Sequence, residues 1–340
     1  METMVRATML TGYFQVARRH GLNPLDLLRE VGLDAGLLVH PEQRMSALAG
    51  CKLLEISADR SDCVTFALEM AALRQAQDLG AVGLILAHRR TLRDTLRTAV
   101  QYRHLLNDAL GIYLESGGNM EAIRVEVISG APTQIRQATE LALGVVARIG
   151  GALLGPHWQP HSVNFAHAAP ADTRLHCRFF GCPVQFDSDF NGIICPANVL
   201  DLPNPAADPD MVRYAESLVM PLNSASPVSI VLEVSKMLYL LLPLGQASLP
   251  DVARALHLSS RTLQRQLQAR GFDFASVLTE VRHHRAVQYL AYTRHSIGRV
   301  AELLGFSRQA SFTRWFIVRF GMTPSAWRAA HPQHHRVTSH

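Results

Sequence analysis

Residues 296–328 read SIGRVAELLGFSRQASFTRWFIVRFGMTPSAWR, and this stretch decides how the C-terminal part of the chain folds. Its apolar residues recur at spacings of three and four, which predicts two amphipathic helices. Gly305 lies between them, where glycine enters a tight turn at little energetic cost, and Gly321 predicts the end of the second helix. Two short helices joined by such a turn form a helix-turn-helix unit, whose second helix enters the DNA major groove.

The second helix of this unit has polar side chains on its solvent side. Arginine and glutamine can hydrogen-bond base edges, and serine and threonine can bond bases or phosphates. The helix is predicted to begin at Arg308, which we interpret as a residue that faces a phosphate. The predicted DNA-contacting set is Arg308, Gln309, Ser311, Thr313 and Arg314.

Another unit of the same kind precedes this one. Residues 249–256 predict its leading helix, 257–259 its turn and 260–270 its recognition helix. No acidic residue lies between Arg254 and Asp273, whereas a merely solvated helix face usually mixes acids with its bases. We therefore interpret the outward positions, at spacings of i, i+3, i+4 and i+7, as contacts to bases or phosphates. These positions are Arg261, Gln264, Arg265 and Gln268.

The spacing within 297–328 resembles the signature of the AraC/XylS family of bacterial transcription regulators. The resemblance implies that the helix 274–292 is a rigid spacer, which presents the two recognition helices to successive major grooves roughly 34 Å apart. Ala310 stands where the family often has a polar residue, so its role reduces to apolar contact with a thymine methyl group. The implied base-facing residues are Gln309, Ser311, Thr313 and Arg314. The matching residues are Ile297, Val300, Ala301, Leu304, Gly305, Phe306, Phe312, Arg314, Phe316, Phe320, Gly321, Pro324, Trp327 and Arg328.

Charge divides the chain in the same way. A length of 340 residues suggests two domains, and the net charge of +5 is unevenly distributed. Residues 227–340 contain 14 Arg and Lys against 5 Asp and Glu, so that part carries +9 and the remainder −4. A basic C-terminal module is the electrostatic footprint of a protein that binds a polyanion such as DNA.

The N-terminal two-thirds has a mixed pattern. Helices are predicted first, then a hairpin near 112–128, a helix at 133–153 and short strands at 162–167, 184–186 and 192–195. This order predicts an α+β domain rather than repeated βαβ units. Further helices are predicted at 5–19, 25–31, 46–57, 64–74, 91–106, 170–180 and 210–222.

This part resembles a branch of the same family that carries an arabinose-binding-like regulatory domain, as in regulators similar to the ornithine-utilisation regulator. The resemblance implies a domain that senses an effector and often dimerises. The branch name is not evidence that arabinose binds, and we assign no effector-binding residue. The matching stretches are His20-Gly21-Leu22-Asn23-Pro24, Thr91-Leu92-Arg93-Asp94, Phe165-x-His167-x-x-Pro170 and Phe179-Phe180-Gly181-Cys182-Pro183-Val184-Gln185-Phe186.

The expected architecture is an α+β N-terminal sensor domain followed by an all-α module with two helix-turn-helix units. The Pro- and Asp-rich stretch 201–209 marks the exit from the first domain. We predict a regulatory domain at 1–205, a connector at 206–228, a DNA-binding domain at 229–330 and a flexible tail at 331–340.

Several classes of protein are not expected. The N-terminus lacks the pattern of a signal peptide, and no apolar run approaches the roughly 20 residues that span a bilayer, so we expect a cytoplasmic protein without membrane contact. The five cysteines, at 51, 63, 177, 182 and 195, are interpreted as reduced thiols. Their spacing does not indicate a zinc site, so no metal and no cofactor are expected. The motifs of hydrolases, phosphate-binding loops and zinc proteases are absent, so we do not expect an enzyme.

The sequence therefore predicts a DNA-binding transcription regulator controlled by a small-molecule effector of unknown identity. Promoter DNA and RNA polymerase are its expected partners, and a homodimer stays open. The alternative is a DNA-binding regulator controlled by a protein partner or by its own abundance. A third reading, an enzyme tethered to a DNA-binding domain, lacks a cysteine in a recognisable activating context.

Overall fold

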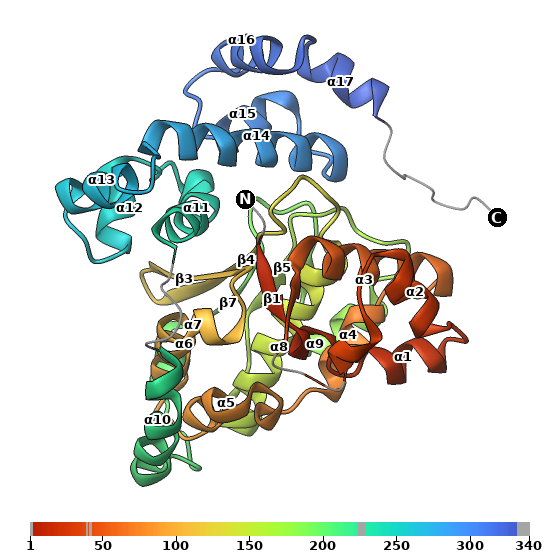
Figure 1. The fold of residues 1–340 in the computed structure, drawn as a ribbon, viewed down its shortest axis with the longest axis vertical. Helices are drawn as coiled ribbons and strands as arrows, with labels where there is room; N and C mark the ends of the chain where they lie inside the picture. The colour runs from red at the N-terminus through yellow and green to blue at the C-terminus, as the bar shows by residue number, and fades with distance from the viewer. Residues whose placement is uncertain (1–2, 39, 41–42, 224–228, 332–340) are drawn as a thin grey trace. The chain divides into compact units, whose positions relative to one another are not determined.

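The structure, a computed structural model, describes residues 3–38, 40, 43–223 and 229–331 (Figure 1). The chain divides into two compact units. Unit 1 comprises Met1–Asn164, Thr173–Gln185 and Asn191–Pro227, and unit 2 comprises Phe165–Asp172, Phe186–Phe190 and Val228–His340. Residues 224–228 of the predicted connector and all of the predicted tail except His331 lie outside the described residues. The predicted domain boundaries stay predictions.

Unit 1 contains a five-stranded sheet in the order β3-β4-β7-β5-β6. β3 and β4 form the predicted antiparallel hairpin, and β7 runs antiparallel to both β4 and β5. β6 pairs with β5 in parallel, and a separate two-stranded sheet pairs β1 with β2. The strands are β1 (Met4–Arg6), β2 (Arg44–Ser46), β3 (Leu110–Gly117), β4 (Met120–Val127), β5 (Ser162–Asn164), β6 (Val184–Gln185) and β7 (Gly192–Pro196).

Ten α-helices of unit 1 surround these strands within the described residues. Together the two kinds of element confirm the predicted α+β class. The helices are α1 (Tyr13–Arg19), α2 (Pro24–Glu30), α3 (Ala47–Ser61), α4 (Phe66–Leu73), α5 (Gly80–Ala87), α6 (Leu92–Gln101), α7 (Arg103–Leu106), α8 (Arg136–Leu154), α9 (Arg174–Phe180) and α10 (Pro209–Asn223).

Two parts of the secondary-structure prediction were wrong. The single helix expected at 5–19 is instead β1, a 3-10 turn and α1, because Gly12 adopts a positive φ of 81° and breaks the helix. α5 was not predicted, since its sequence GAVGLILA has no polar face and contains two glycines. The helix packs against α10, and the apolar cluster that it joins explains why it has no polar side.

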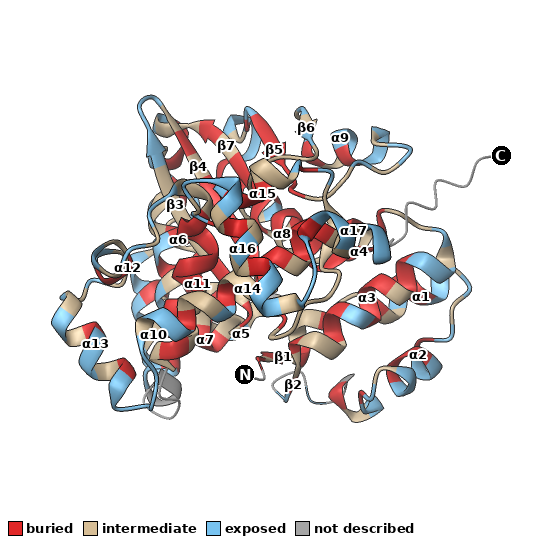
Figure 2. Cartoon of the chain, turned by 90° about the horizontal axis from the view of Figure 1, so that it is seen from above, coloured by how far each residue is buried: buried red, intermediate tan, exposed pale blue. Residues whose placement is uncertain are grey.

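α8 is the central helix of unit 1 and packs against α3, α4 and β4 (Figure 2). Gly150 lies within α8, four residues before its end. It allows close approach, because a Cβ there would lie only 2.6 Å from the ring of Trp158. Among the described residues, Arg136–His157 is the one straight helix long and apolar enough to cross a membrane. Its most apolar window is 61% buried inside the protein, as is usual for a core helix.

The motif at 91–94 begins α6 and fastens it to the sheet. The Thr91 hydroxyl accepts a hydrogen bond from the amide of Asp94 (3.1 Å), so Thr91 is the N-cap of α6. Arg93 donates through Nη1 to Glu121 on β4 (2.8 Å) and through Nε to Asp201 (2.7 Å). These charge-assisted bonds lower the pKa of the Asp201 carboxyl. Arg93 is thus a structural residue rather than a free surface charge.

A carboxyl group is buried where α3 meets α8. The Glu55 side chain is only 7% exposed, and its Oε1 accepts a hydrogen bond from the backbone amide of Gln137 (2.7 Å). Burial raises the pKa of Glu55 to about 8, although the amide bond favours the carboxylate. Because this pKa lies above that of the unfolded chain, the native protein binds the proton more tightly between about pH 4.5 and pH 8.

As pH rises through this window, the wild type should lose stability because Glu55 must ionise in a buried place, and Glu55→Gln should not show this loss. The difference in the free energy of unfolding, variant minus wild type, should therefore increase by about 1.4 kcal/mol per pH unit and level off above pH 8. Chemical denaturation at pH 5.5, 7 and 8.5 measures it, with exposed Glu30→Gln as control. Parallel pH profiles for wild type and Glu55→Gln would show that the carboxyl is not held neutral.

Unit 2 is helical over residues 230–330. The helices predicted at 249–256, 260–270 and 274–292 begin and end within two residues of those bounds, and the all-α module with two helix-turn-helix units is confirmed. α14 packs against α11, α15 and α17 and forms the backbone of the unit. The helices are α11 (Ile230–Leu241), α12 (Leu249–Ala255), α13 (Ser260–Gln268), α14 (Phe274–Tyr292), α15 (Ile297–Leu303), α16 (Gln309–Phe320) and α17 (Pro324–Ala330).

Candidate nucleic-acid interface

The turn of the second helix-turn-helix unit, between α15 and α16, is closed by backbone bonds. Gly305 has a φ of 70°, and its amide donates to the carbonyl of Glu302 (2.8 Å). The amide of Phe306 donates to the carbonyl of Ala301 (2.9 Å), which completes the helix-capping pattern that glycine favours. A Cβ on Gly305 would also lie 3.3 Å from Leu242, so the position is restricted by space as well as by backbone conformation.

Arg282 on α14 holds this turn. Its Nε donates to the carbonyl of Leu304 (2.9 Å) and its Nη2 to the carbonyl of Gly305 (3.2 Å). The guanidinium lies over the ring of Phe306, 4.5 Å from the ring centre. These contacts satisfy carbonyls that the end of α15 leaves without helical partners. The spacer helix therefore positions the second unit through a polar clamp as well as through apolar packing.

Aromatic packing sets the rotation of α16. Phe312 and Phe316 are fully buried in a cluster with Tyr289 of α14 and Val300 of α15. Their rings lie 5.6 Å apart, and the Phe316 ring stacks on Phe320 at 4.0 Å. Since residues four apart share one face of a helix, this burial turns the opposite face toward solvent.

The first helix-turn-helix unit, α12 and α13, repeats the arrangement with one difference. His257 occupies the left-handed position of its turn, with a φ of 56°, where the second unit has Gly305. The amides of His257 and Leu258 bond back to α12 at 3.0 and 2.8 Å. Ser259 then caps α13 by accepting from the amide of Thr262 (3.1 Å). Leu263 and Leu267 are fully buried, as the sequence predicted.

The predicted DNA-contacting residues fall into two solvent-accessible sets, one on each recognition helix. All four residues of the α13 set, Arg261, Gln264, Arg265 and Gln268, are exposed. In the second set, Arg308 is the N-cap of α16 rather than part of the helix. In the second set Arg308, Gln309 and Arg314 are exposed, and Ser311 and Thr313 are half-buried. Within the described residues, none of the four arginines of the two sets pairs with a carboxylate, so their charges are available to phosphates and bases.

Sequence reasoning missed two apolar residues on the outer face of α16. Ile317 is 40% exposed and Val318 is 89% exposed, the second being an extreme value for valine. They lie three and four residues after Arg314, so they share its face of the helix. Ala310 is also exposed. These three side chains could contact thymine methyl groups, which are the apolar feature of the major groove.

A buried arginine attaches α14 to α11. Arg285 of α14 donates to the carbonyl of Tyr239 on α11 (3.2 Å), with the guanidinium over the Tyr239 ring at 4.9 Å. α11 also contains a buried ion pair of its own, since Lys236 has no exposed surface and its Nζ donates to Glu233 (2.9 Å), which is 3% exposed. Loss of one partner of a buried ion pair destabilises a fold by roughly 3–5 kcal/mol, so this pair constrains the packing around α11.

Comparison with known proteins agrees with this geometry. Residues 21–204 match the arabinose-binding domain of AraC transcription regulators, and residues 252–330 match a helix-turn-helix domain. The HTH-type transcriptional regulator VirS of Mycobacterium tuberculosis is 31% identical over 334 residues, which cover 96% of this chain and 97% of that protein. The chain belongs to the AraC family of transcription regulators.

Two further similar proteins match less closely. The ornithine utilization regulator of Pseudomonas aeruginosa is 29% identical over 254 residues, which cover 74% of each protein. The crystal structure of the transcriptional regulator CdpR from Pseudomonas aeruginosa covers 93% of this chain and 98% of that chain, at 19% identity and a TM-score of 0.42. The matched families and relatives are transcription regulators and not enzymes.

In this AraC-family regulator we expect Arg282→Met to weaken unit 2 without touching any predicted DNA-contacting residue. The change removes two hydrogen bonds to backbone carbonyls and the stacking on Phe306, so unfolding should require roughly 1–3 kcal/mol less. Calorimetric unfolding measures it. Arg270→Met, at an exposed arginine beyond α13, is the control and should stay within about 0.5 kcal/mol of wild type. Equal stability of both variants would show that the clamp contributes nothing.

Proposed function

We propose that this regulator is controlled by a small-molecule effector with a carboxylate or phosphate group. The effector binds unit 1, and its binding changes how the two recognition helices of unit 2 engage promoter DNA. The family assignment supports DNA binding and a ligand-binding-like N-terminal domain. The charge of one groove supports the chemical class of the effector.

This basic groove lies in unit 1 where the loop between α5 and α6 meets α10. Its volume is about 420 Å³, within the range of small-molecule sites. Four arginines and a histidine line it against two carboxylates, so the groove favours an anion. The lining basic residues are His88, Arg89, Arg90, Arg97 and Arg213, and the acidic ones are Asp94 and Glu216.

Hydrogen bonds hold the two edges of the basic groove together. Asn204 donates through Nδ2 to the carbonyls of Ala87 and Arg89, both at 2.8 Å. Arg89 pairs with Glu216 on α10 (2.7 Å). In contrast, Arg97 is exposed and forms no ion pair within the described residues. A preformed groove with an unpaired arginine supports recognition of an acidic group, since a guanidinium binds carboxylate or phosphate with two parallel bonds.

A second groove of about 430 Å³ lies near α2, α3 and β2. The charged residues that line it are Asp34, Arg44 and Lys52, so it has fewer basic groups to hold an anion than the basic groove. For that reason we place the effector in the basic groove and treat the other groove as a competing location that the experiment below distinguishes.

Effector control requires that the ligand bind two states of the regulator with different affinity. The affinities for effector and DNA then change by the same factor, because coupling between two binding sites is reciprocal. The alternative, control by a protein partner or by abundance, predicts no small ligand with this property.

We expect a screen of small carboxylates and phosphates to yield a ligand that raises the melting temperature of the full-length protein and changes its affinity for promoter DNA. Arg97→Ala should weaken that ligand by about tenfold or more, through loss of a charge-assisted bond. Arg148→Ala, at an exposed arginine of α8, should not. A ligand unaffected by Arg97→Ala would place the effector elsewhere, and a purely neutral ligand would refute the proposed class.

On the DNA side, we propose that Arg265 and Arg314 read bases while Arg308 contacts a phosphate. Arg265→Ala should relax the sequence preference in one half of the operator, and Arg314→Ala in the other half, about one helical turn away. Each loss should amount to roughly 1–3 kcal/mol.

Binding-site selection with each variant at two salt concentrations measures the effect. A uniform loss of affinity across sequences, with a shallower salt dependence, would assign that arginine to a phosphate instead. If both variants keep the affinity and preferred sequence of the wild type, recognition through two grooves is refuted.

The proposal extends to the partners. RNA polymerase is the expected target of a promoter-bound regulator, and the cytoplasm is its expected compartment.

A second copy of the chain would pack on α10, which exposes Tyr214, Leu218 and Met220 at 60%, 45% and 70%. Sedimentation of the full-length protein, with Leu218→Asp as the variant, tests dimerisation.

A further inference from the structure

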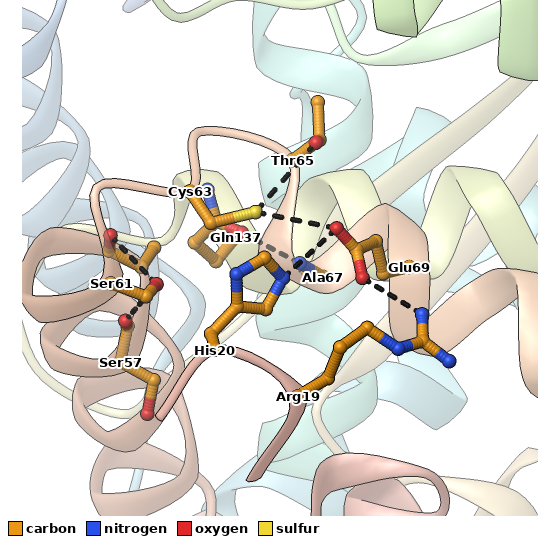
Figure 3. Close-up of polar contacts among 10 residues, drawn as sticks. Arg19, His20, Ser57, Ser61, Cys63, Thr65, Ala67, Glu69 and Gln137 are labelled. Atoms are coloured by element: carbon orange, nitrogen blue, oxygen red, sulfur yellow. Dashed lines mark hydrogen bonds and ion pairs between the residues drawn. The ribbon is translucent and has the colours of Figure 1, made fainter. Parts of the chain in front are cut away.

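Three side chains from separate parts of unit 1 converge on one point (Figure 3). His20 Nε2 lies 3.0 Å from Glu69 Oε1, and Cys63 Sγ lies 3.6 Å from the same oxygen. All three candidate donor atoms lie within 4.8 Å of one another. Histidine, cysteine and glutamate are the ligand types that zinc takes in proteins.

Two of the three spacings are close to those around a tetrahedral ion. With zinc bonds of about 2.0–2.3 Å, donor atoms at tetrahedral angles lie roughly 3.3–3.6 Å apart. The distance to Glu69 Oε1 is 3.6 Å from Cys63 Sγ and 3.0 Å from His20 Nε2. The third distance, between His20 and Cys63, is at most 4.8 Å, so an ion at this point would draw those two side chains toward itself and replace the hydrogen bonds to Glu69.

The backbone at each donor is held in place. His20 ends α1, and its amide donates to the carbonyl of Val16 (3.1 Å). Cys63 lies in the turn after α3, where its amide donates to the carbonyl of Ala58 (3.1 Å). Glu69 lies in the first turn of α4, a helix whose buried residues belong to the same apolar core as α1 and α3. Donors on rigid elements lose little freedom when they bind an ion.

We infer that His20 Nε2, Cys63 Sγ and Glu69 Oε1 form a binding site for zinc or a similar divalent transition metal. The thiolate and imidazole donors select such an ion over magnesium or calcium, which prefer oxygen ligands alone. Three protein ligands leave the fourth position to water or an exchangeable ligand, and the site is open to solvent: the side chains of His20 and Glu69 are 24% and 29% exposed.

Two neighbours complete the site. Arg19 donates through Nη1 to Glu69 Oε2 (3.1 Å), which orients the carboxylate and leaves Oε1 facing the other two donors. Thr65 Oγ1 lies 3.9 Å from Cys63 Sγ on the side away from His20 (Figure 3). Outer groups of this kind fix the direction of metal ligands.

A redox role for Cys63 fits less well. Burial raises the pKa of its thiol, and the nearby carboxylate of Glu69 adds to the effect, so the metal-free thiol stays protonated and unreactive. Metal binding removes that proton to solvent, which makes the affinity fall at low pH. Cys177, which is exposed and lies outside the cluster, offers a matched control.

The test uses chelator-treated, full-length protein titrated with Zn²⁺ and, separately, with Co²⁺. We expect one tight equivalent of Zn²⁺, a higher melting temperature with Zn²⁺, and a thiolate-to-cobalt charge-transfer band with Co²⁺. Cys63→Ser and His20→Gln should each weaken Zn²⁺ binding by more than ~100-fold, since even outer-shell groups account for about 10–100-fold. Cys177→Ser should bind like the wild type.

Histidines of the C-terminal segment need their own control, because His334 and His335 could bind Zn²⁺ adventitiously. The double variant His334→Ala/His335→Ala should keep the tight equivalent. If the double variant loses Zn²⁺ binding while Cys63→Ser keeps it, the inference is overturned. The absence of a thiolate band in the wild type with Co²⁺, a readout that does not depend on how any variant folds, would also overturn it. That result would leave the three groups as a hydrogen-bonded contact only.

Discussion

The contact of Arg282 with the turn at Leu304 and Gly305 ties the second helix-turn-helix unit to the spacer helix. The aromatic cluster around Phe312 and Phe316 then sets the rotation of α16 about its own axis. Both constraints are internal to unit 2, and together they decide which side chains can meet DNA. The arginines of α13 and α16 face solvent because the opposite faces of their helices are buried.

Unit 1 uses buried polar groups in a different way. Arg93 joins α6 to β4 through Glu121, and the Glu55 carboxyl is buried between α3 and the start of α8, where it accepts the amide of Gln137. Such groups make the packing sensitive to protonation, since each has one geometry in which its hydrogen bonds are satisfied.

The sequence allowed most of unit 2 to be predicted, because the helices there alternate buried and exposed residues and end at glycine or serine signals. Phe312 and Arg314 were assigned correctly to the core and the surface. Less could be predicted where the information is not local. α5 is apolar on all sides, so no periodicity marked it. Nothing in the sequence distinguishes Arg282 from a solvated arginine, and only the fold shows that it donates to two backbone carbonyls. His20, Cys63 and Glu69 are separated by more than 40 residues from the first to the second, so no spacing rule could group them.

The central claim is that one rigid helical frame presents two recognition helices to DNA, and a chemical footprint of the full-length protein on its selected operator tests it most directly. Methylation interference at guanine N7 reports major-groove contact base by base. The account predicts two contacted major-groove segments on one face of the duplex, with centres about 10–10.5 base pairs apart. One contacted segment, or protection confined to the minor groove, would contradict it.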